Sequence, residues 1–440
     1  MTDSDERPRP GHRLDRRSFL TTLPGAAAGA ALLPSALVQV AHGQAGTDRD
    51  ALVTIFLRGG LDGLSLVVPW GDPEYAVHRR DGASDLSVTP GHFLDDSHFF
   101  GLHPAASPLL TPFGEGRLAF VHQAGLKVNG TRSHFDAMGR VEAGAATATL
   151  PPTGWVTRVL QQLPPSSTGL RATALASLLP RLLAGAPQTL PIRNPGAYSF
   201  PAPPSLEALR RARLELVYGT SGDPVLGPAG RTTLQAADQV EAVGAAGYTT
   251  HGAVPYPQTP FGQGLKDIAA LLTSSEVTLE AAHIDLGDWD HHDTMGVLDG
   301  EFAALVADLA SSLEAFYLDL QAAGVSYTLV AQSEFGRRIA TNASEGTDHG
   351  KGGLMLVMGP GVNGGQVLPT SWRTATEADP LASPLHPQNW DDGDLAVLID
   401  HREVLAEICL DRLGLTPAQV ESEVFPGFTL PPTDWGVTAP

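Results

Sequence analysis

The sequence has 440 residues, a formal net charge of −20 (28 Lys and Arg against 48 Asp and Glu) and a hydrophobic content of 42%. This length is sufficient for one large α/β domain or two domains of ordinary size. The acidic excess argues against nucleic acid as a partner, because binding to phosphates requires clustered Lys and Arg. One cysteine, Cys409, excludes an internal disulfide framework and a cysteine-based zinc site.

Residues 1–45 are predicted to be an export signal. Residues 1–19 are polar and rich in arginine, the stretch Leu20–Ala41 is uncharged, and small residues follow it. This order is typical of a cleaved signal peptide, and Arg16-Arg17 resembles the twin-arginine signal. The alternative, a membrane-spanning helix, is disfavoured by two prolines in the apolar stretch. We therefore expect export through the twin-arginine translocase to the periplasm or outside the cell, with no stable membrane span after cleavage.

Five short apolar segments are predicted to be strands. Continuous apolar runs rich in β-branched and aromatic residues are typical of strands buried on both faces of a parallel sheet. The five segments are Leu52–Leu57, Leu118–His122, His283–Leu286, Tyr327–Gln332 and Leu354–Met358.

Helical patterns lie between these strands. The clearest is Phe302–Ala323, where apolar residues recur every three or four positions and Gly324 follows as a stop signal. The other predicted helices are Leu206–Tyr218, Thr232–Ala246, Leu265–Leu272 and Asp394–Leu413. Strands that alternate with helices predict an α/β fold with a mainly parallel central sheet flanked by helices.

The domain organisation is predicted to be one domain over residues 46–440. Two stretches, near 70–104 and 180–204, look irregular and are expected to be loop insertions, the second of them a lid or crossing loop. A division into two domains is the alternative.

Polar groups lie next to every predicted strand at what is expected to be one edge of the sheet. Functional groups in open α/β sheets gather at the carboxyl ends of the strands. In chain order they are Asp62, Arg132 with Ser133, Asp288–Asp293, Glu334 with Arg337, and Asp348 with His349.

Each of these segments also has a structural explanation. Asp62 can belong to a turn, Ser133 can cap a helix, and Glu334 can pair with Arg337. The run Asp288–Asp293 can be a solvated acidic loop. However, mixed carboxylates and imidazoles at one edge suit a divalent metal ion such as Zn²⁺ or Mn²⁺.

Seven segments together carry a family resemblance. They are FLRGGLDGLSLVVP (56–69), GLHPA (101–105), TRSHFDA (131–137), GDWDHHD (287–293), SEFGRR (333–338), GTDHGKGG (346–353) and DHREVLAEI (400–408). In this order they resemble an exported bacterial family of unknown function, usually introduced by a twin-arginine leader and grouped with the alkaline phosphatase and sulfatase superfamily.

The resemblance implies an alkaline phosphatase-like fold and specific roles for residues. It implies Ser133 as nucleophile and Arg132 as an anion clamp. The implied metal ligands are Asp62, Asp290, His292, Glu334, Asp348 and His349. His291 stands where the family usually has threonine, and Phe335 stands where the superfamily has a ligating histidine.

The implied function is that of an exported metal-dependent hydrolase of phosphate or sulfate esters, with Ser133 or a metal-bound water as the nucleophile. Its substrate would be a small anionic ester or derive from the cell envelope. Two alternatives remain: a non-catalytic metal-binding member of the same fold, and a protein that binds envelope material or polysaccharide. A serine triad of Ser133, His134 and Asp136 is discounted, because neighbouring helical residues point in different directions.

Overall fold

The structure is a computed structural model that describes residues 49–80, 85–200 and 203–439. The predicted export signal, residues 1–45, lies outside these residues. All described residues fall within one compact unit of the chain.

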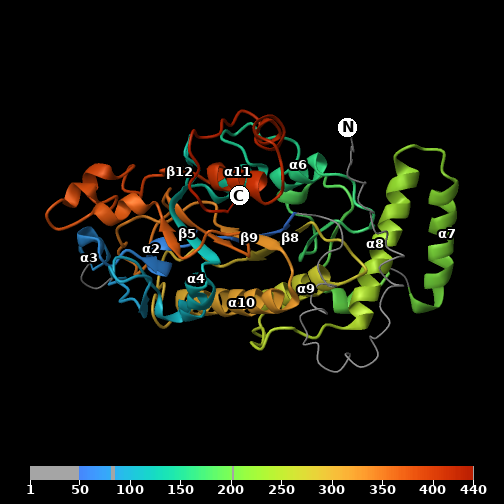
Figure 1. The fold of residues 1–440 in the computed structure, drawn as a ribbon, viewed down its shortest axis with the longest axis horizontal. Coiled ribbons are helices and arrows are strands. Elements are labelled where there is room, and N and C mark those ends of the chain that lie inside the picture. Colours follow the sequence, from blue (N-terminus) through green and yellow to red (C-terminus); the bar gives the residue numbers. More distant parts are fainter. Residues whose placement is uncertain (1–48, 81–84, 201–202, 440) are drawn as a thin grey trace, which may run out of the picture. The chain divides into compact units, whose positions relative to one another are not determined.

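The central element is a large sheet with the strand order β11–β5–β10–β9–β1–β8–β6–β7, in which β12 also pairs with β5 (Figure 1). Every pairing in it is parallel except the two made by β10. The predicted α/β class with a mainly parallel sheet is therefore confirmed. The strands are β1 (Ala51–Leu57), β5 (Leu118–Gly125), β6 (Ala172–Ala174), β7 (Thr189–Pro191), β8 (Ala281–Leu286), β9 (Tyr327–Gln332), β10 (Gly353–Met358), β11 (Gln366–Leu368) and β12 (Ile399–Asp400).

The direction of β10 determines where its preceding loop lies. Because β10 runs antiparallel to β5 and β9, its first residue, Gly353, is at the edge where those two strands end. The segment 346–352 thus joins the loops that follow β1, β8 and β9. In an all-parallel sheet this segment would lie at the opposite edge.

Helices cover both faces of the sheet (Figure 1). The helices α9 and α10 contribute to one buried cluster, and α6 and α11 contribute to the other. The longer helices are α5 (His134–Ala143), α6 (Trp155–Gln162), α7 (Glu207–Thr220), α8 (Leu226–Ala246), α9 (Pro260–Thr273), α10 (Glu301–Ala323) and α11 (His401–Asp411). Short helices are α2 (Gly63–Leu66), α3 (Pro73–Arg79), α4 (Leu110–Gly114) and α12 (Pro417–Gln419).

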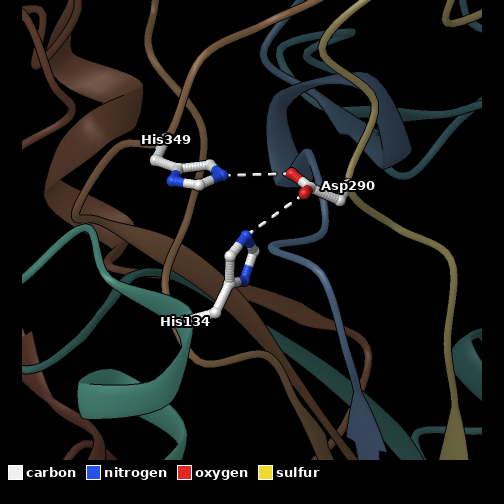
Figure 2. Close-up of side chains that lie close together, drawn as sticks. All are labelled: His134, Asp290 and His349. Carbon is white, nitrogen blue, oxygen red and sulfur yellow. Dashed lines mark hydrogen bonds and ion pairs between the residues drawn. The ribbon is translucent and has the colours of Figure 1, made fainter.

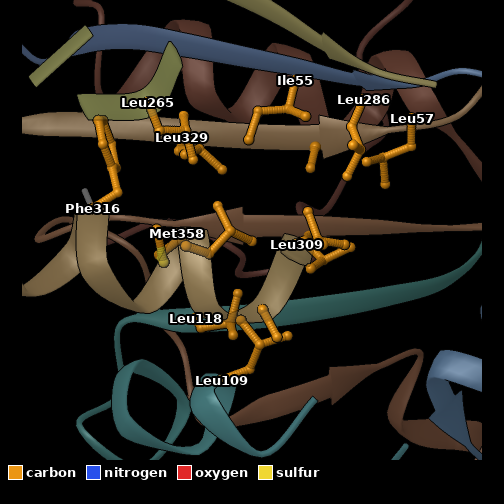
Figure 3. Close-up of a cluster of buried hydrophobic side chains, with 14 of the residues drawn as sticks. Ile55, Leu57, Leu109, Leu118, Leu265, Leu286, Leu309, Phe316, Leu329 and Met358 are labelled. Atoms are coloured by element: carbon orange, nitrogen blue, oxygen red, sulfur yellow. The ribbon is translucent and has the colours of Figure 1, made fainter. Parts of the chain in front are cut away.

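Strand β1 shows how the sequence builds these layers. Its residues alternate between faces, so that Ile55 and Leu57 pack with Leu309 of α10, whereas Leu52 belongs to the cluster on the other face. Figure 3 shows the first of these clusters. All seven residues of β1 are buried, as expected for a strand covered by helices on both sides.

Several boundaries differ from the sequence prediction. Helix α8 begins at Leu226 rather than Thr232, and α9 begins at Pro260 rather than Leu265. The stretch 180–204 is not irregular throughout, because Thr189–Pro191 forms the edge strand β7. The stretch 70–104 contains α3 and the strands β3 (His92–Phe93) and β4 (Gly101–Leu102). These two strands form a small separate sheet with β2 (Val67–Val68), in the order β2–β4–β3. The last predicted helix begins at His401 rather than Asp394, because Ile399 and Asp400 pair with β5 first.

Within the described part of the chain, none of the helices combines the length and apolar character that a membrane crossing requires.

Candidate metal centre

Three side chains from distant segments meet at the carboxyl edge of the sheet (Figure 2). His134 is the first residue of α5, Asp290 follows β8, and His349 precedes β10. The two Asp290 oxygens lie between the imidazoles: Oδ2 is 3.2 Å from His134 Nε2, and Oδ1 is 3.0 Å from His349 Nε2. One potential ligand atom from each of the three side chains lies within 4.8 Å of the others.

A fourth side chain, His292, completes the group. Its Nε2 atom lies 3.1 Å from Asp290 Oδ1 and 2.9 Å from His349 Nε2. Together with the 3.0 Å between Asp290 and His349, the three atoms form a nearly equilateral triangle. Bonds of about 2.0–2.1 Å in a tetrahedral zinc site place ligand atoms roughly 3.3 Å apart. The triangle would therefore have to widen only slightly to hold one ion.

His134 and His349 are oriented by contacts of their other ring nitrogens. His134 Nδ1 lies 2.7 Å from Oε1 of the buried Glu334, and His349 Nδ1 lies 2.8 Å from the Arg132 carbonyl oxygen. Metal-binding histidines usually have such a partner, which fixes the ring and raises its basicity. Glu334 thus has the contacts of a group that orients His134.

A buried arginine contributes positive charge beside Asp290. Arg337 NH2 donates to Asp290 Oδ1 at 2.6 Å, and Nε of the same side chain donates to the Gly60 carbonyl at 2.6 Å. Burial acts to raise the pKa of Asp290, but hydrogen bonds from Arg337 and His349 outweigh it and hold the pKa at about 2. Asp290 is therefore a carboxylate at neutral pH, the form that binds metal.

The adjacent histidines His291 and His292 have different environments. The His291 ring is buried and packs 5.8 Å from the Phe302 ring, and this burial lowers its pKa. The His292 side chain is 43% exposed and faces the metal-binding group. Of the two, His292 is thus the imidazole that contacts Asp290 and His349, and its ligand role stays a prediction.

The turn after β1 supports the centre through a glycine. Gly59 has a φ of +119°, and a Cβ atom there would lie 2.6 Å from the Asp290 backbone nitrogen. Its own N–H donates to Glu334 Oε1 at 3.0 Å. Glycine at this position therefore permits the β1 turn to touch both the Asp290 loop and Glu334.

Phe335 is a packing residue. It is buried with Ala137 and Val141 in a small cluster beneath α5. Its ring centroid lies 4.9 Å from that of His134 and 4.8 Å from that of His349. It therefore forms one side of the centre and packs against the helix that carries His134.

Ser133 and Arg132 lie beside the centre but are placed differently. Ser133 is the exposed N-cap residue of α5, and its hydroxyl accepts no capping hydrogen bond. The Arg132 guanidinium is bound to Asp394 Oδ2 at 2.6 Å and to Asp392 Oδ2 at 3.1 Å. Its charge is thus already shared with two carboxylates, and its role as an anion clamp stays a prediction.

The structure does not bring Asp62 to these ligands. Its carboxylate caps α2 at the Leu64 N–H and pairs through both oxygens with the buried Arg79. Asp348 is nearer, since its Oδ1 lies 3.3 Å from His292 Nδ1. The contacts of Asp348 are those of a partner that orients His292, while both ligand roles stay predictions.

Two residues of the centre were not among the predicted site residues. His134 is in the TRSHFDA segment, next to the predicted nucleophile Ser133, and its side chain faces Asp290 from the first position of α5. Arg337 is predicted to pair with Glu334, whereas its guanidinium contacts Asp290. The sequence signal for both residues is their place in a segment already predicted to be at the site. His134 directly follows Ser133, and Arg337 comes three residues after Glu334.

Comparison with known proteins gives a structural likeness and a family match. The C-terminal periplasmic domain of EcEptC from Escherichia coli, solved in complex with Zn, covers 89% of this chain and 92% of its own, at 10% identity and a TM-score of 0.36. No curated protein matches the sequence. Residues 153–424 match the profile of a family described as protein of unknown function (DUF1501), and this range includes Asp290, His292 and His349 but not His134. Since the match covers well over half of the sequence, the chain belongs to this family of proteins of unknown function.

Proposed function

We propose that the protein is an exported, metal-dependent hydrolase of phosphate or sulfate esters. The observation that carries the proposal is the triangle of Asp290 Oδ1, His292 Nε2 and His349 Nε2, with edges of 2.9–3.1 Å, beside His134. Nitrogen and carboxylate ligands in this number suit Zn²⁺, and Mn²⁺ is the next candidate.

The proposed ion would act as a Lewis acid at the ester and help to generate the nucleophile from Ser133 or water. Ser133 is well placed because its neighbours on both sides contact the centre, Arg132 through its carbonyl and His134 through its ring. The free N–H groups at the start of α5 can bind non-bridging oxygens of an anionic ester. Local positive charge of this kind is necessary in a chain with a net charge of −20.

The proposed site of action is the periplasm or the cell exterior. Support comes from the sequence, where Arg16-Arg17 precedes an uncharged stretch and small residues. Replacement of Arg16 and Arg17 by lysine is expected to retain the protein inside the cell, as measured by fractionation and immunoblotting.

Metal analysis combined with hydrolysis assays tests the main proposal. Purified protein is expected to contain a divalent metal by elemental analysis and to cleave 4-nitrophenyl phosphate or 4-nitrophenyl sulfate. Asp290→Asn should lose the metal and the activity, and Ser133→Ala should keep the metal. The exposed Asp299 provides the control variant Asp299→Asn, which should keep both. Protein that binds no divalent ion and cleaves neither ester across a range of ions would refute the proposal.

A non-catalytic metal-binding member is the second candidate. Two observations favour it: the Arg132 guanidinium is committed to Asp392 and Asp394, and Phe335 occupies space beside both His134 and His349. In that case the metal would be present without hydrolysis of any ester. Binding of envelope polysaccharide that persists in a variant lacking Asp62, Asp290 and His349 would instead support a binding role that needs no metal.

A further inference from the structure

A pocket lies at the carboxyl ends of β6 and β8, and the residues of the metal centre are not among those that line it. It has a volume of about 310 Å³, within the range of small-molecule sites. Strand β6 pairs with β8 only as far as His283, so the last residues of β8 have no strand neighbour on that side. Helix α9 and the segment after β7 enclose this space. Its lining includes Leu175, Arg193, Phe261, Asp267, Ile284 and Asp285.

Helix α9 presents one face to this pocket. Gly264 lets the helix approach β8, since a Cβ atom there would lie 2.4 Å from Ile284 Cδ1. Phe261 and Asp267 stand three positions before and after this glycine, on the same face of the helix. The local sequence thus places one aromatic ring and one carboxylate against the pocket.

Asp267 is a carboxylate without a partner. Among the described residues, none forms a hydrogen bond or ion pair with its side chain, although the residue is largely covered by its surroundings. Burial raises its pKa to about 6, and the one charge that opposes this shift is that of Lys266. Asp285, by contrast, is satisfied by Arg58 at 2.7 Å and His283 at 2.9 Å.

Arg193 is an unpaired cation on the wall of the same pocket. Its guanidinium is exposed and forms no hydrogen bond or ion pair with any residue that the structure describes. Arg193 and Asp267 line the pocket from different segments, the stretch after β7 and helix α9, and they form no ion pair with each other. Opposite charges that line one cavity without meeting provide two separate points of recognition for one ligand.

We propose that this pocket binds a small zwitterion, with its ammonium group on Asp267, its carboxylate on Arg193 and an apolar group against Phe261, Leu175 and Ile284. An amino acid with an apolar side chain and a short apolar peptide share this chemistry. The ammonium would supply the countercharge that Asp267 lacks, and the arginine fork matches a carboxylate. The proposal does not depend on the metal centre or on ester hydrolysis.

Isothermal titration calorimetry on the purified protein tests the proposal with four probes. L-leucine and L-leucyl-L-leucine carry both charges, whereas isoamylamine and isocaproate each carry one. At least one zwitterion is expected to bind about tenfold or more tightly than either singly charged analogue. Tighter binding of L-leucine would indicate a free amino acid as the ligand, and tighter binding of L-leucyl-L-leucine would indicate a short peptide. Binding should persist after chelator treatment, which separates this pocket from the metal centre.

Matched variants assign the two charges. Asp267→Asn should weaken binding of the zwitterion and of isoamylamine by about tenfold and leave isocaproate binding unchanged. Arg193→Gln should weaken binding of the zwitterion and of isocaproate by about tenfold and leave isoamylamine binding unchanged. Asp299→Asn is the control, and circular dichroism verifies that each variant folds. The proposal is wrong if none of the four probes binds, if the zwitterions have no advantage, or if both variants bind them as the wild type does.

Discussion

The carboxylate of Glu334 illustrates how one buried residue can govern the candidate centre without being a ligand. It lies 2.7 Å from His134 Nδ1 and accepts hydrogen bonds from the Gly59 N–H and the Ser333 hydroxyl. Since no part of its side chain is exposed, its charge is balanced only by such donors.

Replacement of Glu334 by glutamine is expected to weaken metal binding by about 10- to 100-fold, because His134 loses its charge-assisted orienting contact. Competition with a metal-binding dye measures this affinity. Asp299→Asn is the control, since that exposed carboxylate lies outside the centre and should leave the affinity unchanged. Equal losses in the two variants would contradict the orienting role.

Asp267 gives a residue-scale prediction on pH. Burial raises the pKa of its carboxyl to about 6 from an ordinary value of 3.8, against the opposing effect of Lys266. The native state then holds this proton more tightly than the unfolded chain. Its contribution to the free energy of unfolding consequently falls as pH rises from 3.8 to about 6.

Asp267→Asn removes this titration. Relative to the wild type, the variant should gain little stability near pH 4 and about 1–2 kcal/mol above pH 7, since solvent partly screens this carboxylate. Urea unfolding at several pH values measures the difference. Asp299→Asn, an exposed carboxylate, should show an offset that does not vary with pH. A constant offset for Asp267→Asn as well would mean that its carboxyl is not perturbed.

At the scale of elements, the contact between the β1 turn and the Asp290 loop is tight. A Cβ on Gly59 would lie 2.6 Å from one backbone nitrogen and 2.8 Å from another, those of Asp290 and Trp289. Backbone atoms cannot move aside as a flexible side chain can. Gly59→Ala is therefore expected to cost about 3 kcal/mol or more and to displace Asp290.

Gly116→Ala is the control for this prediction. Gly116 also has a positive φ, +69°, but a Cβ there would meet nothing within 4 Å. Its replacement carries the backbone strain alone, about 1 kcal/mol. Urea unfolding and metal content should both distinguish the two variants, and similar effects of the two would show that the close approach has no consequence.

Several elements were predictable because their sequence signals are local. The strand β9 matches its predicted bounds, and α10 ends at Ala323, just before Gly324, whose φ of +69° suits a glycine stop. The start of α11 was not predictable from periodicity, because an apolar spacing continues through Ile399. The Asp400 side chain caps the helix by accepting a hydrogen bond from the Arg402 N–H. Asp400 is the cap residue because β12, which ends at Asp400, pairs with β5.

The sequence predicts at which edge of the sheet the candidate site lies, but it does not predict every residue of the site. Asp290, His292 and His349 follow from their position beside strand ends. Asp62 has the same kind of position, yet a long-range contact with Arg79 of α3 occupies its carboxylate. Sequence spacing carries no information about such a partner, because α3 lies in a stretch that looks irregular.

At the scale of the whole molecule, metal binding should stabilise the fold. Four potential ligands come from three segments, so an ion bound to the native state alone shifts the unfolding equilibrium. At a free metal concentration of 100 times Kd, the expected gain is about 2.7 kcal/mol. Thermal unfolding of chelator-treated protein should shift upward on addition of Zn²⁺. Asp290→Asn should abolish the shift, and an equal shift in that variant would place the ion elsewhere.

The wide separation of the ligands along the chain has a consequence for the order of folding. His134 and Asp290 come together only when α5 and the loop after β8 have both joined the sheet, and closing so long a loop is slow. Before then the chain offers an ion only local groups such as Asp290 and His292. An ion would accordingly be captured late, after the rate-limiting step, and would slow unfolding rather than hasten folding. If the chain folds before export, the identity of its metal would be decided by the supply inside the cell.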